Sequence, residues 1–240
     1  MTARAAWLAI AGLMLLAPHA AGAQAYQCRM PERLSPLPPV KRPANEPRRV
    51  LPVTGYTLAL SWSPEFCKGR EDDARQRLQC SRDHGEFGFV LHGLWPEASG
   101  PRYPQYCAAQ PARVPQSVVR SLLCDMPSPR LIEHQWLKHG SCMARDPASY
   151  FRVSTTVYRA TRIPDMERLS RRPLTYGMLR RAFAQANPGM QPDTIAIKAN
   201  ARGWLQEVRI CLGRNLKPNA CPRHVRQPRG DTMIKIWRGL

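Results

Sequence analysis

The sequence predicts an α+β fold: a central antiparallel sheet flanked by several helices and stapled by disulfides. Strand-like apolar runs come first, a block of helical patterns follows, and strand patterns return near the C-terminus. Separate blocks of strands and helices favour an antiparallel sheet over a parallel α/β arrangement. The eight cysteines all lie after position 23, and an even set of this size is typical of an exported, disulfide-bonded protein.

The first 23 residues have the features of a secretory signal peptide. Arg4 is followed by an apolar run over 5–17 and by Ala21-Gly22-Ala23, a small-residue cleavage site. We expect cleavage before Gln24 and a periplasmic or secreted product. An uncleaved anchor is the alternative, but the run is short for a bilayer span. No later segment predicts a span, so none is expected in the mature chain.

Residues 24–52 predict an extended arm rather than a helix or strand. The segment holds seven prolines and six basic residues against two acidic ones. We therefore divide the chain into a signal peptide (1–23), a proline-rich basic arm (24–52) and one folded domain (53–240).

Within the domain, the expected elements follow from apolar periodicity and from caps. Strands are expected at 56–62, 87–91, 194–198, 205–212 and 233–237. Helices are expected at 115–124, 129–139, 147–162 and 175–187. Asp146-Pro147 and Thr175 supply N-terminal caps, and Gly140 stands at a C-cap position. The polar stretch 68–84 predicts a loop closed by Cys67 and Cys80.

The formal net charge is +19. Such a charge raises the local concentration of polyanions, of which RNA is the obvious one, although anionic lipid or acidic polysaccharide would fit on charge alone. The alternative is that the charge only keeps the protein soluble.

Two segments, 89–96 and 133–142, carry the chemistry. The first ends a strand with His92-Gly93, followed by what reads as a rigid turn through Trp95-Pro96. In the second, a helix places His134, Gln135, Lys138 and His139 within an arc of about 140°. Glu133 points away from this arc. Two imidazoles can share proton transfers near neutral pH, and an ammonium can hold a phosphate. Together they suit cleavage of an RNA phosphodiester without a metal.

Each segment alone also has a structural interpretation. A polar helix face is often only solvated, and tryptophans such as Trp95 are more often core than base-stacking platforms. No clustered carboxylates accompany the histidines and no Cys-x-x-Cys occurs, so a metal site is disfavoured and we expect no cofactor.

The two segments resemble the paired active-site signatures of the ribonuclease T2 family. Residues 92–96 match His-Gly-Leu-Trp-Pro throughout, and 134–142 match the second signature except at Gln135, where the family usually carries glutamate. The similarity covers roughly residues 53–225. It includes Trp62 before Phe66-Cys67 and the late pair Cys211 and Cys221.

The resemblance implies an endoribonuclease that cleaves single-stranded RNA through 2′,3′-cyclic phosphates. We expect it to be exported and to act as a monomer. His139 would be the general base and His92 the general acid, while Lys138 and His134 would hold the phosphate. Trp95, Tyr56 and Trp62 would contact bases.

Gln135 keeps the hydrogen-bonding capacity of glutamate but cannot transfer a proton. We expect a reduced rate or an altered pH optimum. The alternative is a non-catalytic cationic protein that binds nucleic acid or an envelope surface through its basic arms, with a site weakened at Gln135.

The resemblance also implies the disulfides Cys107–Cys142 and Cys211–Cys221. Local spacing suggests Cys67–Cys80, which leaves Cys28–Cys124.

Overall fold

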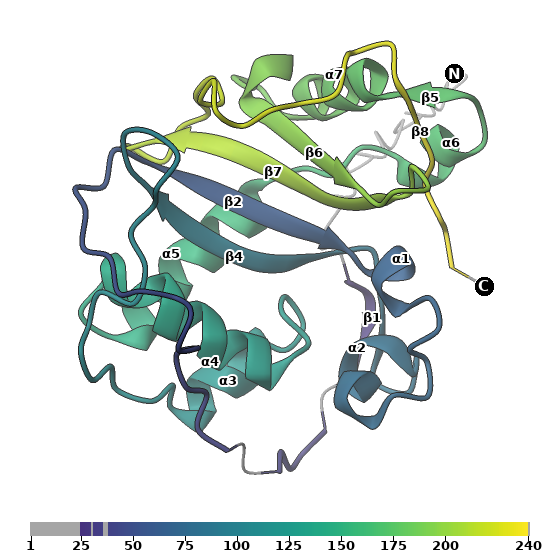
Figure 1. Ribbon diagram of the computed structural model, residues 1–240. Helices are drawn as coiled ribbons and strands as arrows, with labels where there is room; N and C mark the ends of the chain where they lie inside the picture. The colour runs from purple at the N-terminus through teal and green to yellow at the C-terminus, as the bar shows by residue number, and fades with distance from the viewer. Residues whose placement is uncertain (1–24, 30, 36–37, 240) are drawn as a thin grey trace, which may run out of the picture.

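The main sheet has four antiparallel strands. In the computed structural model, which describes residues 25–29, 31–35 and 38–239, the strand order is β4-β2-β7-β6. The expected signal peptide, residues 1–23, lies outside the described residues. The strands are β2 Gly55–Trp62, β4 Phe89–Glu97, β6 Ile195–Ala199 and β7 Leu205–Gly213. Helices surround the sheet (Figure 1), which confirms the α+β class.

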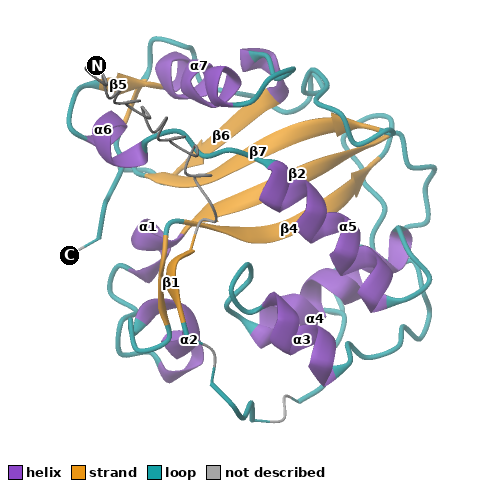
Figure 2. Ribbon diagram, turned by 180° about the vertical axis from the view of Figure 1, so that it is seen from behind, coloured by secondary structure: helices purple, strands orange, loops and turns teal. Residues whose placement is uncertain are grey.

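One face of the sheet forms the core. Leu58, Leu60, Val208 and Ile210 are fully buried there. Helix α5 (Pro147–Ala160) crosses in front of the sheet in the view of Figure 2. The hydroxyls of its Tyr150 and Tyr158 donate to the carbonyls of Leu94 and Phe89. These bonds satisfy buried polar groups and tie the helix to β4.

The helices begin where side chains cap them. Ser128, Asp146 and Thr175 each accept a hydrogen bond from a backbone N–H in the first turn. The main helices besides α5 are α3 Gln116–Leu122, α4 Pro129–Lys138, α6 Met166–Ser170 and α7 Tyr176–Ala186. Helix α6 was not predicted.

Short elements complete the described fold. These are α1 Ser63–Cys67, α2 Arg77–Cys80, β1 Ala25–Cys28, β3 Gly85–Phe87, β5 Leu174–Thr175, β8 Met233–Ile234 and the 3₁₀ turns Ala74–Gln76, Gly140–Cys142 and Pro192–Thr194. The predicted 68–84 loop therefore contains helical turns, and the late strand is only two residues long. Strand β2 ends at Trp62, and Pro64 stands in the first turn of α1, where its missing N–H costs nothing.

The expectation of a turn after His92 is wrong. Strand β4 runs on through Pro96 to Glu97. It can do so because β4 is an edge strand, where a proline need not donate to a neighbour.

The proline-rich arm lies on the domain. Strand β1 pairs with β3, although no strand was expected in the arm. Farther along, Arg49 and Gln105 form an antiparallel bridge, and the Arg48 guanidinium donates to the carbonyl of Cys107.

Four disulfides join distant segments. They are Cys28–Cys124, Cys67–Cys80, Cys107–Cys142 and Cys211–Cys221. Cys107–Cys142 braces the chain directly after α4. Within the described residues, no helix is long and apolar enough to cross a membrane.

Candidate active site

A β-bulge turns His92 toward the same side as Trp95. Along β4, Gly93 pairs with Ala59 and Leu91 pairs with Leu60, so His92 is the extra residue between them. In a regular strand, neighbouring side chains alternate between faces, and His92 would point away from Gly93, Trp95 and Glu97. The bulge puts His92 on their face. This strand irregularity, which the sequence did not predict, assembles the first half of the site.

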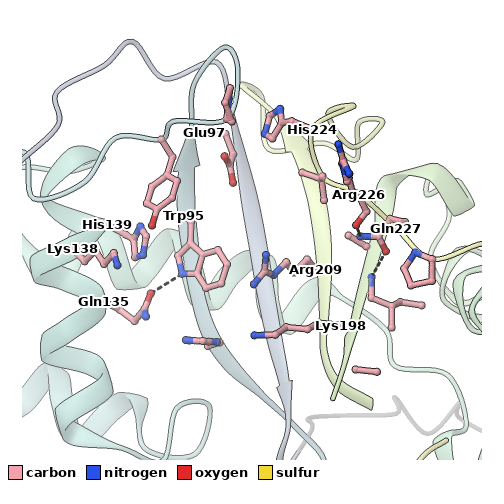
Figure 3. A pocket seen from close by; sticks show the side chains of 18 of the residues that line it. Trp95, Glu97, Gln135, Lys138, His139, Lys198, Arg209, His224, Arg226 and Gln227 are labelled. Carbon is pink, nitrogen blue, oxygen red and sulfur yellow. Dashed lines mark hydrogen bonds between the residues drawn. The ribbon is translucent and has the colours of Figure 1, made fainter. Parts of the chain in front are cut away.

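Helix α4 supplies the second half. His134, Gln135, Lys138 and His139 line one cavity of about 700 Å³ together with His92 and Trp95. The cleft lies between α4 and the open face of the sheet (Figure 3). The structure thus brings the two predicted histidines, the lysine and the glutamine into one cleft.

Trp95 stands between the two histidines. Its ring centroid lies 5.4 Å from that of His139, in a stacked arrangement, and 5.1 Å from that of His92. Its indole Nε1 donates to Gln135 Oε1 at 2.8 Å (Figure 3). The Arg209 guanidinium lies 4.9 Å from the indole centroid. Trp95 is therefore fixed on several sides.

His92 is held by a carboxylate from β7. Its Nδ1 lies 2.6 Å from Glu207 Oε2, and Arg209 contacts the other oxygen of the same carboxylate at 2.6 Å. Burial would raise the pKa of Glu207, but the hydrogen bond and charge of His92, with help from Arg209, outweigh it and lower the pKa. An ionised carboxylate only accepts hydrogen bonds, so Nδ1 carries a proton and Nε2 remains for exchange with a ligand.

His139 sits in a very different environment. Only 5% of the residue is exposed, and its Nδ1 has no hydrogen-bond partner among the described residues. Burial, with the charges of Lys138, His134 and His92, places the pKa of His139 well below its usual value. A neutral imidazole with this low pKa can accept a proton but holds it weakly.

The other two polar residues of α4 lie beside it. Burial and the Lys138 charge also lower the pKa of His134, against a weaker opposite effect of Glu46. The Lys138 ammonium forms a 2.8 Å ion pair with Glu46 of the arm. Glu133, which the helical periodicity placed off this arc, contacts Arg113 at 3.3 Å.

Two glycines let the halves approach. A Cβ on Gly93 would lie 2.1 Å from Gln135 Oε1, and one on Gly140 would lie 2.5 Å from the Trp136 ring. Gly140 does not adopt the left-handed conformation of a C-cap glycine, and the chain continues into a 3₁₀ turn. The C-cap prediction for Gly140 is wrong. A glycine is required here because neighbouring side chains pack closely against it, and not because the backbone adopts a left-handed conformation.

Two predicted base-contacting residues do not line this cleft. Trp62 is 3% exposed, packs on Phe89 and donates its indole N–H to the carbonyl of Trp237. Tyr56 is half-buried and packs against the core. Both belong to β2, whose side chains here are covered by neighbouring segments.

Other cleft residues were missed. The lining also includes Glu97, Tyr103, Lys198, Arg209, His224 and Arg226. A charged pair at 207 and 209 within an otherwise apolar strand was a usable signal for Glu207 and Arg209. No group of three or more His, Cys, Asp or Glu side chains within the described residues could hold a metal ion.

Known proteins are similar to this chain in both sequence and fold. The family model described as "Ribonuclease T2 family" matches residues 54–221. A "Probable ribonuclease" of Haemophilus influenzae is 30% identical over 180 residues, which are 71% of this chain and 61% of that protein. A "Ribonuclease" of Aeromonas hydrophila is 32% identical over 167 residues, covering 66% of this chain and 71% of that one.

Two solved structures share the fold at low identity. Trichomaglin, described as a novel S-like ribonuclease, superposes with a TM-score of 0.61 at 17% identity and covers 77% of this chain and 97% of its own. An RNase-related protein from Calystegia sepium superposes with a TM-score of 0.59 at 19% identity. The match covers 76% of this chain and 96% of that protein. With the family match over most of the domain, these findings establish that the chain belongs to the ribonuclease T2 family.

Proposed function

We propose that this protein is an endoribonuclease that cleaves single-stranded RNA by transesterification, leaving 2′,3′-cyclic phosphate ends. The observation that carries the proposal is the shared cleft: His92 and His139 line one cavity with Lys138 in a strongly basic protein. The family to which the chain belongs and the names of its relatives support the same activity.

His139 acts as the general base. Its low pKa keeps the imidazole neutral, so it can take the proton of the 2′-hydroxyl. The oxygen then attacks the adjacent phosphorus. The stacked ring of Trp95 packs against the imidazole.

His92 acts as the general acid. Glu207 binds Nδ1 and stabilises the imidazolium, so Nε2–H can be given to the departing 5′-oxygen. The opposite environments of the two rings support these roles, because a buried neutral ring can accept a proton and a ring paired with a carboxylate can donate one.

Positive groups hold the phosphate. Lys138 and His134 lie on α4 close to His139. Lys198 and Arg209 approach from the sheet (Figure 3). Fixed cationic groups stabilise the charge that grows on the phosphorane-like transition state. The exposed parts of Trp95 and Tyr103 offer ring faces for an unpaired base.

We also propose export. The pattern of residues 1–23 and four disulfides both favour an oxidising compartment.

The test compares RNA with DNA of the same sequence, in a chelator, for the wild type and for His92→Ala and His139→Ala. We expect only RNA to be degraded, and each substitution to reduce the rate by at least about a hundredfold. Binding without degradation, or equal loss of RNA and DNA, would refute the proposal and favour a nucleic-acid-binding protein or another nuclease.

A further inference from the structure

Lys138 does not face the cleft alone. Glu46 Oε2 lies 2.8 Å from its Nζ, and the two side chains are 32% and 13% exposed respectively. Glu46 belongs to the proline-rich arm and lies before residue 54, where the family match begins. The carboxylate paired with Lys138 therefore comes from a segment that the family match does not cover.

Tyr106 fixes this ion pair from the other side. Its hydroxyl donates to the same Glu46 oxygen at 2.5 Å, and its ring centroid lies 5.8 Å from the Lys138 ammonium. The backbone N–H of Tyr106 donates to the carbonyl of Lys138 at 2.8 Å. Tyr106 is 2% exposed and adopts a φ of 52°, a costly conformation for a side-chain-bearing residue. The neighbouring Cys107–Cys142 disulfide anchors the same stretch to the end of α4.

The arm bonds within itself at Glu46 and is docked on the domain directly after it. Arg42 donates to the carbonyl of Glu46 itself, and Gln105 donates to the carbonyl of Pro47 at 2.7 Å. Arg48 then binds the carbonyl of Cys107. In Figure 1 this dark blue stretch passes along α4. The carboxylate is thus delivered by a docked segment.

The Glu46 carboxylate is the counter-charge to Lys138, because the neighbouring side chains on the helix are cationic or neutral. Lys138 is flanked by His134 on the same helix and by His139 at the helix C-cap. The side chain at position 135 in this stretch is a neutral amide. Glu46 and Tyr106 face it from the arm and from the loop before Cys107. The hydrogen bonds from Lys138 and Tyr106 lower the pKa of Glu46, so Glu46 is ionised across the working range.

We propose that Glu46 is a positioning residue for RNA cleavage: with Tyr106 it fixes the Lys138 ammonium where the scissile phosphate binds. This proposal rests on the proposed ribonuclease function. A lysine side chain loses rotamer freedom when it is ordered. If Glu46 orders it before the substrate arrives, the transition state does not bear that cost.

The pair leaves Lys138 able to bind phosphate. An ammonium has three donors, and Glu46 takes one of them. Neutralising Glu46 should therefore leave substrate binding intact, or tighten it, while the chemical step slows. An inhibitory contact would behave oppositely, because its removal would raise the rate.

The experiment compares kcat and KM for RNA in the wild type, Glu46→Gln, Tyr106→Phe and Arg48→Met. Glu46→Gln keeps the shape of the side chain and removes its negative charge. Arg48→Met, two residues away, removes the arm's hydrogen bonds to Cys107 but keeps the carboxylate. We expect Glu46→Gln to lower kcat about tenfold without raising KM, Tyr106→Phe to lower it about threefold, and Arg48→Met to stay within about twofold of the wild type. Thermal midpoints report whether each variant folds.

An unchanged or increased kcat in a folded Glu46→Gln protein overturns the proposal. Equal losses in Glu46→Gln and Arg48→Met, with matching falls in midpoint, also overturn it, because they indicate a role in arm docking only. A wild type that leaves RNA intact would instead refute the ribonuclease function, before any variant is compared.

Discussion

Gln135 is buried where the two halves of the site meet. Only 1% of it is exposed, and its Oε1 accepts the indole hydrogen of Trp95. Its role here is to orient Trp95, which in turn stacks on His139. An amide does this without adding charge. The pKa of His139 is then set by burial and by its cationic neighbours, all of which lower it.

Substituting Gln135→Glu should move the acid limb of the pH–rate profile to higher pH. The wild-type base has a pKa well below 6.5, so its kcat/KM should hold to below that pH and fall only when His139 is protonated. A carboxylate at 135 favours the imidazolium and raises that pKa, so activity is lost earlier on acidification. The measurement is kcat/KM from about pH 4 to about pH 8.

Gln116→Glu, at the exposed start of α3, serves as the matched control and should leave the acid limb in place. Superimposable profiles for wild type and Gln135→Glu would contradict the electrostatic account of His139.

Glu207→Gln should slow cleavage by about tenfold. The amide keeps the shape but no longer stabilises the His92 imidazolium as a carboxylate does, so the departing oxygen receives its proton less readily. Steady-state kinetics on RNA measure the loss. Glu86→Gln on the exposed part of β3 is the control, with no change expected. If Glu207→Gln were as active as the wild type, His92 would not depend on this carboxylate.

At the scale of elements, the bulge in β4 and the missing Cβ of Gly93 bring the strand and α4 together. Without the bulge, His92 would face away from the cleft. Without a glycine at 93, Gln135 could not reach Trp95. A local irregularity of the sheet and one small residue thus decide whether the two imidazoles meet.

Gly93→Ala should therefore reduce both stability and activity. A Cβ there would lie 2.1 Å from Gln135 Oε1 and 2.7 Å from Trp95 Nε1. Overpacking of this kind costs about 1–3 kcal/mol of unfolding free energy. Denaturant unfolding measures it, with Gly230→Ala as control, since a Cβ on Gly230 would lie 3.8 Å from the Cα of Gly177, an ordinary contact. Equal stability of the two variants would show that the contact is easily relieved.

Most elements were predictable because they are specified locally. Caps and periodicity located α4, α5 and α7, and apolar runs located β2, β6 and β7. The bulge was not predictable, because register depends on the partner strand rather than on residues 89–97 alone. Glu46 was missed for a similar reason, because it reaches Lys138 only through tertiary packing. The charges at 207 and 209 marked strand β7, but the pairing of Glu207 with His92 also depends on tertiary packing. Trp62 was misassigned because a buried tryptophan and a base platform look alike in sequence.

At the scale of the whole molecule, disulfides and the docked arm enclose the domain. Cys28–Cys124 ties the arm to the segment after α3 across 96 residues of chain, whereas Cys211–Cys221 spans only 10. In a chain-entropy view, a disulfide that closes a longer loop removes more freedom from the unfolded chain.

Removing Cys28–Cys124 by double alanine substitution should lower the free energy of unfolding by about 2–5 kcal/mol. The loss should exceed that for Cys211–Cys221 by about 2 kcal/mol, because of loop length. Denaturant unfolding of both variants gives the comparison. The reverse order would show that native contacts, rather than loop closure, set the contribution of each bridge.

Whether His92 and His139 cleave RNA together through the 2′-hydroxyl is tested most directly by the ends that cleavage leaves. An oligoribonucleotide with one 2′-deoxy residue, digested in a chelator and analysed by mass spectrometry, gives the answer. We predict 2′,3′-cyclic phosphate and 5′-hydroxyl ends at the ribose linkages and no cut after the deoxy residue. Cleavage after the deoxy residue, or 5′-phosphate ends, would contradict this mechanism.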